Sequence, residues 1–209
     1  MLERSRTQVK NDSRRRSSGL SRIVCVIAAV AGSLIVPSAV SAGTSELPKS
    51  LLQFAESELI QIGREQVIVQ AVRAQNAKKG SLKRIKEIDE WWKASEDVEP
   101  FMFDLMRNRC ALTLENFQVH NKFVLEAFVM DNQGALVALT NKTSDYWQGD
   151  EDKFTESYMD GAGAIHYGDV EYDESTGEIQ VQISVPVMDG GRAIGAITFG
   201  ISLDRWERR

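Results

Sequence analysis

The sequence predicts an α+β domain in which helices come first and an antiparallel sheet of about five strands follows. Apolar residues recur at helical spacing from Leu51 to Ala74. From Phe123 the period changes to the two-residue alternation of strands, and strand-like runs separated by turn residues continue to Leu203. Helices followed by consecutive strands are typical of α+β domains.

Three helical stretches are predicted before the sheet. The first begins near Pro48 and is either one long helix or two helices with a break near Gly63. Ser81 can cap the second helix, which carries two adjacent tryptophans. The third stretch runs from about Phe101 to Arg109. We expect the tryptophans to divide, one ring in the core and the other near the surface or a pocket, or both to serve core packing.

The predicted strands are residues 123–129, 135–140, 169–172, 178–187 and 193–203. The first pair is joined by a turn at Asp131–Gly134, where glycine supplies the positive φ that a hairpin requires. The second pair is joined through residues 175–177. Residues 145–160 are predicted to form a helical or irregular crossover between the two hairpins.

The first 42 residues have the pattern of a secretory signal peptide. A basic segment is followed by the uncharged apolar run Ile23–Val40 and by small residues that permit cleavage after Ala42. The alternative is an uncleaved membrane anchor, since about 18 apolar residues approach the length that spans a bilayer. Either way, we expect a single domain over residues 43–209 outside the cytoplasm, periplasmic or secreted.

Composition restricts the partners of this domain. Residues 43–209 contain 18 basic and 28 acidic side chains, a net charge of −10. Nucleic acids and anionic membranes attract cationic surfaces, so neither is an expected partner. Cys110 is the one cysteine in this range, which excludes an internal disulfide, and we expect it to be buried as a small apolar residue.

The order of motifs resembles the Cache superfamily, also called PDC sensors. The supporting segments are Val69–Asn76 on the long helix, Phe128–Gly134 at the first hairpin, Thr143–Asp150, Tyr172–Glu178, and Val185–Val187 with Gly195–Ile197. The resemblance implies a single Cache domain: a PAS-like sheet preceded by a long N-terminal helix, which senses small molecules outside the cytoplasm. Such domains usually serve chemoreceptors or sensor kinases. Because the sequence ends at Arg209, we expect a module that reports through a partner of this kind.

The sequence departs from the Cache pattern for amino-acid ligands. That pattern has an arginine, a tryptophan–tyrosine pair and an aspartate on the last strand. Here the aromatic pair is inverted as Tyr146-Trp147, Ser144 stands where the arginine is expected, and Gly200 stands where the aspartate is expected. An amino acid is therefore not the expected ligand.

The candidate ligand-binding residues are Asp145, Tyr146, Trp147, Gln148, Tyr172 and Asp173. Aromatic walls with a few convergent polar groups are typical of small-molecule sites, and carboxylates beside aromatic rings favour a cationic or polyhydroxylated ligand. The alternative is that Tyr146 and Trp147 pack on the sheet while Asp145 caps the next helix.

Other polar clusters have simpler explanations. We expect the alternating carboxylates of Asp169–Asp173 to line the outer side of a strand whose Val170 and Tyr172 point inward, and Asp150–Asp152 to start a solvated helix. His120 and His166 lack metal-motif spacing, and no base is paired with a nucleophile, so we expect no cofactor, no metal and no enzymatic activity. The alternative function is a module of the same fold without a ligand, which dimerises through its N-terminal helix.

Overall fold

The computed structural model describes residues 47–173 and 177–209. The predicted signal peptide and residues 174–176 of the second hairpin lie outside this range. Within it, no helix has both the length and the apolar composition needed to cross a bilayer.

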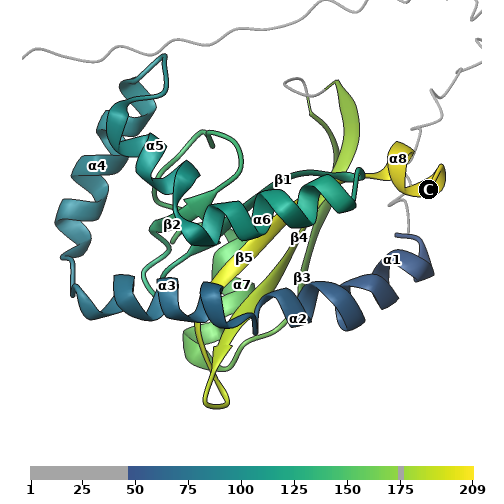
Figure 1. Cartoon of the computed structure of the whole chain (residues 1–209), viewed down its shortest axis with the longest axis horizontal. Helices are drawn as coiled ribbons and strands as arrows, with labels where there is room; N and C mark the ends of the chain where they lie inside the picture. Colours follow the sequence, from purple (N-terminus) through teal and green to yellow (C-terminus); the bar gives the residue numbers. More distant parts are fainter. Residues whose placement is uncertain (1–46, 174–176) are drawn as a thin grey trace, which may run out of the picture. The chain divides into compact units, whose positions relative to one another are not determined.

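The helices before the sheet follow the predicted order (Figure 1). Their bounds are α1 (Lys49–Phe54), the π-helical η1 (Ala55–Leu59), α2 (Ile60–Ile62), α3 (Gln66–Ala77), α4 (Leu82–Ala94), α5 (Pro100–Arg107) and α6 (Arg109–His120). The first three run without interruption and the chain breaks at Gly63, which was one of the two alternatives that the sequence left open. Ser81 caps α4 through a hydrogen bond that its hydroxyl accepts from the amide of Arg84.

The sequence did not predict α6. Its start is fixed by Asn108, whose side chain accepts a hydrogen bond from the amide of Ala111 and donates one to the carbonyl of Val137. The helix buries Leu114 but leaves Leu112 52% and Val119 58% exposed. Apolar residues on the exposed side interrupt the 3.6-residue spacing of apolar and polar positions, so the amphipathic pattern that identifies a helix is weak here.

The predicted five-stranded antiparallel sheet is confirmed. The strands are β1 (Val124–Met130), β2 (Leu136–Leu139), β3 (His166–Asp173), β4 (Glu178–Asp189) and β5 (Arg192–Ser202), in the spatial order β2-β1-β5-β4-β3. The crossover contains α7 (Asp152–Tyr158) and the 3-10 helix η2 (Met159–Gly161), and α8 (Leu203–Glu207) follows β5. The turn after β1 has Gly134 at φ 81°, as the hairpin prediction requires.

A register shift between Val124 and Glu126 alters the predicted alternation in β1. From Ala127 onward, alternate residues enter two different cores, with Ala127 and Val129 in one and Phe128 and Met130 in the other. Before the shift Leu125 is only partly buried, because the shift breaks the alternation that places Ala127 and Val129 in one core.

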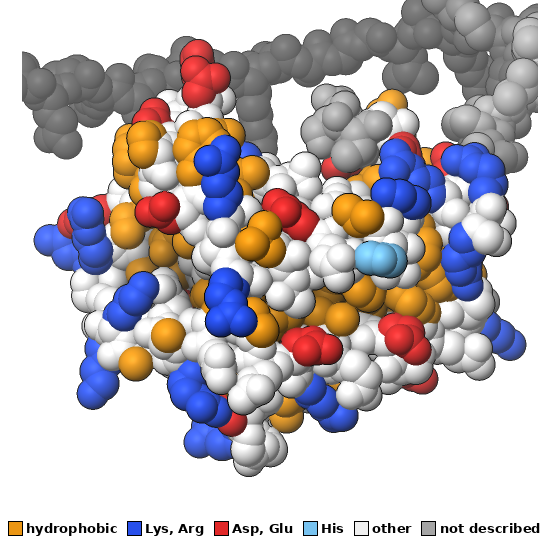
Figure 2. All heavy atoms as spheres, viewed as in Figure 1, with side chains coloured by type: hydrophobic (Ala, Val, Ile, Leu, Met, Phe, Trp, Pro, Cys, Tyr) orange, Lys and Arg blue, Asp and Glu red, His pale blue; other side chains and the backbone are white. Residues whose placement is uncertain are grey.

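Helices cover both faces of the sheet. In Figure 1, α1–α3 and α6 lie in front of the strands and α7 lies behind them. The front core joins α1, α3 and α6 to the apolar side of β4 and β5. Figure 2 shows this front face, where basic, acidic and apolar side chains are interspersed. The rear core gathers side chains of α4, α5, α7 and the first hairpin, including Trp92, Phe128 and Phe154.

The two adjacent tryptophans of α4 lie in different environments, one buried and one exposed, which was one of the two predicted arrangements. Trp92 is fully buried and its indole N–H donates to the carbonyl of Thr143 over 2.8 Å. Trp91 is 49% exposed and stacks on Phe101 at a centroid distance of 4.4 Å. Cys110 is buried, as expected.

Candidate functional site

The rear face of the sheet is polar at one end. Along β4, Val181, Ile183 and Val185 enter the front core, so the alternate residues Gln180 and Gln182 point to the rear. On the neighbouring β5 this face carries Thr198, Gly200 and Ser202, and on β1 it carries Glu126 beside Phe128. The other end of the same face is apolar and lies in the rear core.

Two adjoining hollows lie over the polar end, and together we call them the sheet cavity. The outer hollow has a volume of about 630 Å³ and the inner about 310 Å³. The outer one is lined by Asp150, Glu151, Asp152, Lys153, His166, Tyr167, Gly168, Asp169, Glu171, Gln180 and Gln182. The inner one is lined by Glu126, Phe128, Lys142, Thr143, Ser144, Gln148, Lys153, Asp173, Gln180 and Gln182. Three of these residues are common to both.

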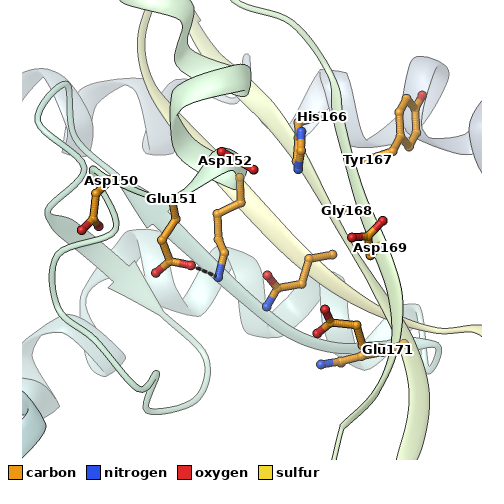
Figure 3. Close-up of a pocket in the computed structure, with 11 residues that line it drawn as sticks. Asp150, Glu151, Asp152, His166, Tyr167, Gly168, Asp169 and Glu171 are labelled. Carbon is orange, nitrogen blue, oxygen red and sulfur yellow. Dashed lines mark ion pairs between the residues drawn. The ribbon is translucent and has the colours of Figure 1, made fainter. Parts of the chain in front are cut away.

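The walls of the outer hollow come from distant parts of the chain. Figure 3 shows Asp150, Glu151 and Asp152 on one side and the β3 residues on the other, with Glu151 and Glu171 directed toward the space between them. The start of α7 supplies the first wall and β3 supplies the second, where Glu171 pairs with Gln180 of the rear face while Val170 pairs with Val181 of the front core. Asp169 and Glu171 are exposed, as expected, and they border the outer hollow.

Carboxylates dominate the lining. Five line the outer hollow and two more, Glu126 and Asp173, line the inner one, against only Lys142 and Lys153. Both lysines have other partners: Lys153 pairs with Glu151 at 2.8 Å, and Lys142 donates to the carbonyls of Ser95 and Asp97. The field in the cavity thus favours positively charged ligands.

Glu126 is a partly buried carboxylate of the inner hollow. Burial raises its pKa, while the hydrogen bond from Gln182 and the charge of Lys153 act against that shift. The Gln182 Nε2 donates to Glu126 Oε1 over 3.1 Å. A charged carboxylate in such a place is costly unless further donors or cations satisfy it.

In the side-chain amide of Gln180, the nitrogen has a hydrogen-bond partner and the oxygen has none among the described residues. The residue is 8% exposed, and its Nε2 donates to the carboxylate of Asp173. No group in residues 47–173 or 177–209 donates to its Oε1, although that oxygen is buried. A buried acceptor without a donor is costly and marks a place where a ligand can contribute the missing bond.

The predicted ligand-binding residues separate into two groups. Gln148 and Asp173 line the inner hollow. Neither hollow is lined by Asp145, Tyr146, Trp147 or Tyr172. The ligand-binding role of all six residues stays a prediction.

The aromatic pair is held by structural contacts. Asp89 on α4 is buried, and its Oδ1 accepts hydrogen bonds from the amides of Tyr146 and Trp147, both over 2.9 Å. Burial raises the pKa of Tyr146 to about 12. The Trp147 indole N–H donates to the carbonyl of Gln133 over 2.7 Å. The pair thus anchors the loop that forms one wall of the cavity.

Asp145 and Tyr172 lie differently from expectation. Asp145 does not cap α7, whose N-cap residue is Glu151, and instead forms an ion pair with Lys93 at 3.2 Å. Val170 packs against the front core as predicted, but Tyr172 is 65% exposed because it lies near the tip of the β3–β4 hairpin, beyond that core. Its predicted inward orientation is wrong.

The sequence did not single out several lining residues, among them Glu126, Lys153, Gln180 and Gln182. A signal existed in β4, where polar residues alternate regularly with Ile and Val from Glu178 to Ser184. That pattern is also that of a solvent-facing strand, so the sequence could not distinguish a covered polar face from an open one.

Metal ligation is not indicated by the described residues. No group of three or more histidine, cysteine or carboxylate side chains within them has metal-binding geometry. His166 lines the outer hollow and its Nδ1 lies 2.8 Å from a carboxylate oxygen of Glu156.

No protein-family model matches the sequence, and neither does any curated protein. Among solved structures, the V. cholerae histidine kinase DctB sensor domain is similar at 15% identity and a TM-score of 0.44 over 76% of this chain and 51% of that one. The ligand-binding domain of Campylobacter jejuni chemoreceptor Tlp3, in complex with 4-methylisoleucine, gives 16% identity and 0.39 over 75% and 65%. That of the Pseudomonas aeruginosa amino acid chemoreceptor PctC, in complex with GABA, gives 12% and 0.37 over 68% and 60%.

All three are sensor or ligand-binding domains. One belongs to a histidine kinase and two belong to chemoreceptors. The chain spans between about half and two thirds of the length of each solved domain. At these identities the likeness concerns the fold, so the nature of the ligand has to be argued from the residues of this chain.

Proposed function

We propose that this chain is a sensory module that acts outside the cytoplasm, binds a small molecule in the sheet cavity and reports to a partner protein such as a sensor kinase or chemoreceptor. The observation that supports this proposal is that the rear face of the sheet is polar at an end that other elements cover. Glu126, Gln180 and Gln182 lie there under a loop and a helix, where packing alone would favour apolar side chains.

The apolar end of the same sheet face is closely packed and can be compared with the polar end. Phe128, Met130 and Ala196 lie one after another in the rear core, covered by Phe154 of α7 and by Trp92. The apolar pattern stops at Glu126, two residues before Phe128 in β1, and the hollows begin there. A change from close packing to a hollow lined by polar groups, on one continuous sheet face, favours ligand binding over a structural role.

The connections of the cavity wall suggest how binding is reported. The loop that contains Gln148 is tied to α4 by Asp89, and Arg73 of α3 pairs with Asp189 at the end of β4 at 2.6 Å. A ligand with different affinities for two arrangements of loop and sheet would shift the population between them. The helices would then present that shift to the partner.

The alternative function, a ligand-free module that dimerises through its N-terminal helix, has less support. The large apolar side chains exposed on the described part of the chain are Leu82, Trp91, Phe103, Leu112, Val119, Met159, Tyr172 and Ile179. None belongs to α1, α2 or α3. A dimer interface normally buries exposed apolar surface, and these helices offer little of it.

A thermal-shift screen of the full chain tests the proposal with amines, organic acids, sugars and nucleobases. A ligand at 100 times its dissociation constant should stabilise the protein by about 2.7 kcal/mol. For each ligand found, Gln182→Met should abolish the shift because it removes a polar group from the cavity floor. The matched control Gln61→Met, on an exposed position of α2, should retain it.

Two results would contradict the proposal. One is the absence of a shift in all four ligand classes, together with a dimer in analytical ultracentrifugation, which would favour the interaction module. The other is a ligand whose shift survives Gln182→Met and Trp147→Ala in folded protein, since its site would then lie elsewhere.

A further inference from the structure

Two acceptors converge over the backbone of Gly200. A Cβ built on this residue would lie 3.1 Å from Glu126 Oε1 and 3.1 Å from Gln180 Oε1. Glu126 and Gly200 face each other directly in the register of β1 and β5. The lack of a side chain at position 200 therefore leaves the space in which a carboxylate oxygen and an amide oxygen approach the same point.

One of the two acceptors lacks a donor. Gln182 supplies one hydrogen bond to Glu126, but no described group donates to Gln180 Oε1. The orientation of the Gln180 amide is fixed by Asp173, because reversing it would place an amide oxygen against a carboxylate. Two oxygens that approach a common point repel one another unless a donor lies between them, and one of these two has no donor, so the pair is suited to a group that brings several N–H bonds.

The charges that line the sheet cavity favour one chemical class of ligand as the donor to Glu126 and Gln180. Seven carboxylates line the sheet cavity against two lysines, and both lysines have other partners. No arginine lines either hollow, so a ligand carboxylate would find no bidentate partner there. The described residues also contain no metal-binding group of the usual ligands. A compact organic cation fits these conditions better than an acid, a sugar or a metal ion.

We infer that the sheet cavity binds an organic amine, whose ammonium group donates to the carboxylate of Glu126 and to Oε1 of Gln180. This inference rests on the proposed function and specifies its ligand class. Phe128 beside Glu126 supplies an apolar wall for the carbon skeleton, and the outer carboxylates can attract a second ammonium group in a diamine.

Isothermal titration of the full chain with matched probes tests the inference. n-Butylamine and 1,4-diaminobutane carry the cation, n-butanol keeps the skeleton without charge, and butyrate reverses the charge. We expect both amines to bind, the diamine more tightly, and the alcohol and the acid to bind at least 10-fold more weakly than butylamine.

Substitutions at Glu126 and Gln180 test whether these two side chains accept hydrogen bonds from the amine. Glu126→Gln keeps the shape of the side chain and should weaken amine binding 10- to 100-fold, which is the usual effect of losing a charge-assisted hydrogen bond. Gln180→Met should weaken it by a similar factor. Glu90→Gln removes the same charge from an exposed position on α4 and should change binding less than 2-fold.

The results separate this inference from the proposed function. If an acid, sugar or nucleobase shifts the melting temperature and no amine binds, the inference fails and the sensory function stands. If no class binds, both fail. Amine binding that Glu126→Gln and Gln180→Met leave unchanged in folded protein overturns the site, and so does calcium chloride alone binding with the same dependence on Glu126. Should Glu126→Gln not fold, Gln180→Met decides the matter.

Discussion

Glu126 on β1 faces Gly200 on β5, and its side chain occupies the space that a side chain at residue 200 would need. A Cβ at that position would lie 2.7 Å from Glu126 Cγ, closer than such atoms approach. The Cache resemblance led us to expect an aspartate at position 200 in a site for amino acids. In this chain the neighbouring strand places a carboxylate at the same point of the sheet.

Gly200→Ala should therefore destabilise the protein and weaken ligand binding. The added methyl group must displace Glu126 or Gln180, and overpacking of this kind typically costs about 1–3 kcal/mol. Urea unfolding measures the loss of stability, and titration with butylamine measures the loss of binding.

Gly80→Ala provides the matched control for that substitution. A Cβ at residue 80 meets no atom within 4 Å, and this glycine is not in the positive-φ set. The control should leave stability unchanged or raise it by a few tenths of a kcal/mol. Equal effects of the two substitutions would contradict the crowding around Gly200.

The pH dependence of stability should report the burial of Glu126. Its pKa is raised in the folded protein, so the folded state holds its proton more tightly than the unfolded state, where the pKa is about 4.3. The resulting stabilisation is complete below that value and is lost as the pH rises through the folded-state pKa. The groups that act on this carboxyl are Gln182 from β4, Lys153 from α7 and Asp173 from β3.

Glu126→Gln should accordingly stabilise the protein relative to wild type at pH 7, and the difference should shrink toward pH 4. Each unit by which the pKa is raised corresponds to about 1.4 kcal/mol. Urea unfolding of both proteins between pH 4 and pH 8 measures the difference. A difference that is constant with pH would show that Glu126 titrates normally.

Asp89→Ala should cost about 2–4 kcal/mol and loosen the wall of the cavity. It leaves the amides of Tyr146 and Trp147 without their acceptor, and it removes the partner that Lys93 contacts at 2.7 Å. The protection of these two amides against hydrogen exchange should fall with the free energy of unfolding.

Glu87→Ala, on an exposed position of the same helix, is the control for Asp89. Its carboxylate contacts only Arg84 at 3.1 Å among the described residues, in an exposed pair of the kind that contributes little. We expect a change within about 0.5 kcal/mol. If the two variants lose similar stability, Asp89 does not anchor the loop.

Cys110 should be inert toward thiol reagents in the folded protein. It is 1% exposed, and burial raises the pKa of its thiol to about 12, so the reactive thiolate is scarce at pH 8. Labelling with a disulfide reagent should be negligible in native buffer and complete in denaturant. Rapid labelling of the native protein would show that α6 opens readily.

Some features were accessible from the sequence because they depend on local chemistry. Ser81 and Gly134 act within a few residues of themselves, so the cap of α4 and the first turn could be predicted. The strands were readable where polar and apolar residues alternate, as in β4, or where a short apolar run lies beside turn residues, as in β2. By contrast, α6 was missed because partners distant in sequence, such as Val137, compensate for its weak amphipathic pattern.

In the proposed binding site, too, some features follow from the local sequence and others depend on contacts between distant residues. By itself, the sequence determined the order of helices and strands and the alternation of polar and apolar residues along β4, since both arise from backbone periodicity. Whether Gln180 and Gln182 meet solvent or a cavity was decided only by the tertiary structure, which brings α7 and the loop of Gln148 over them. Side-chain alternation fixes the face to which a residue points, and only long-range packing fixes what covers that face.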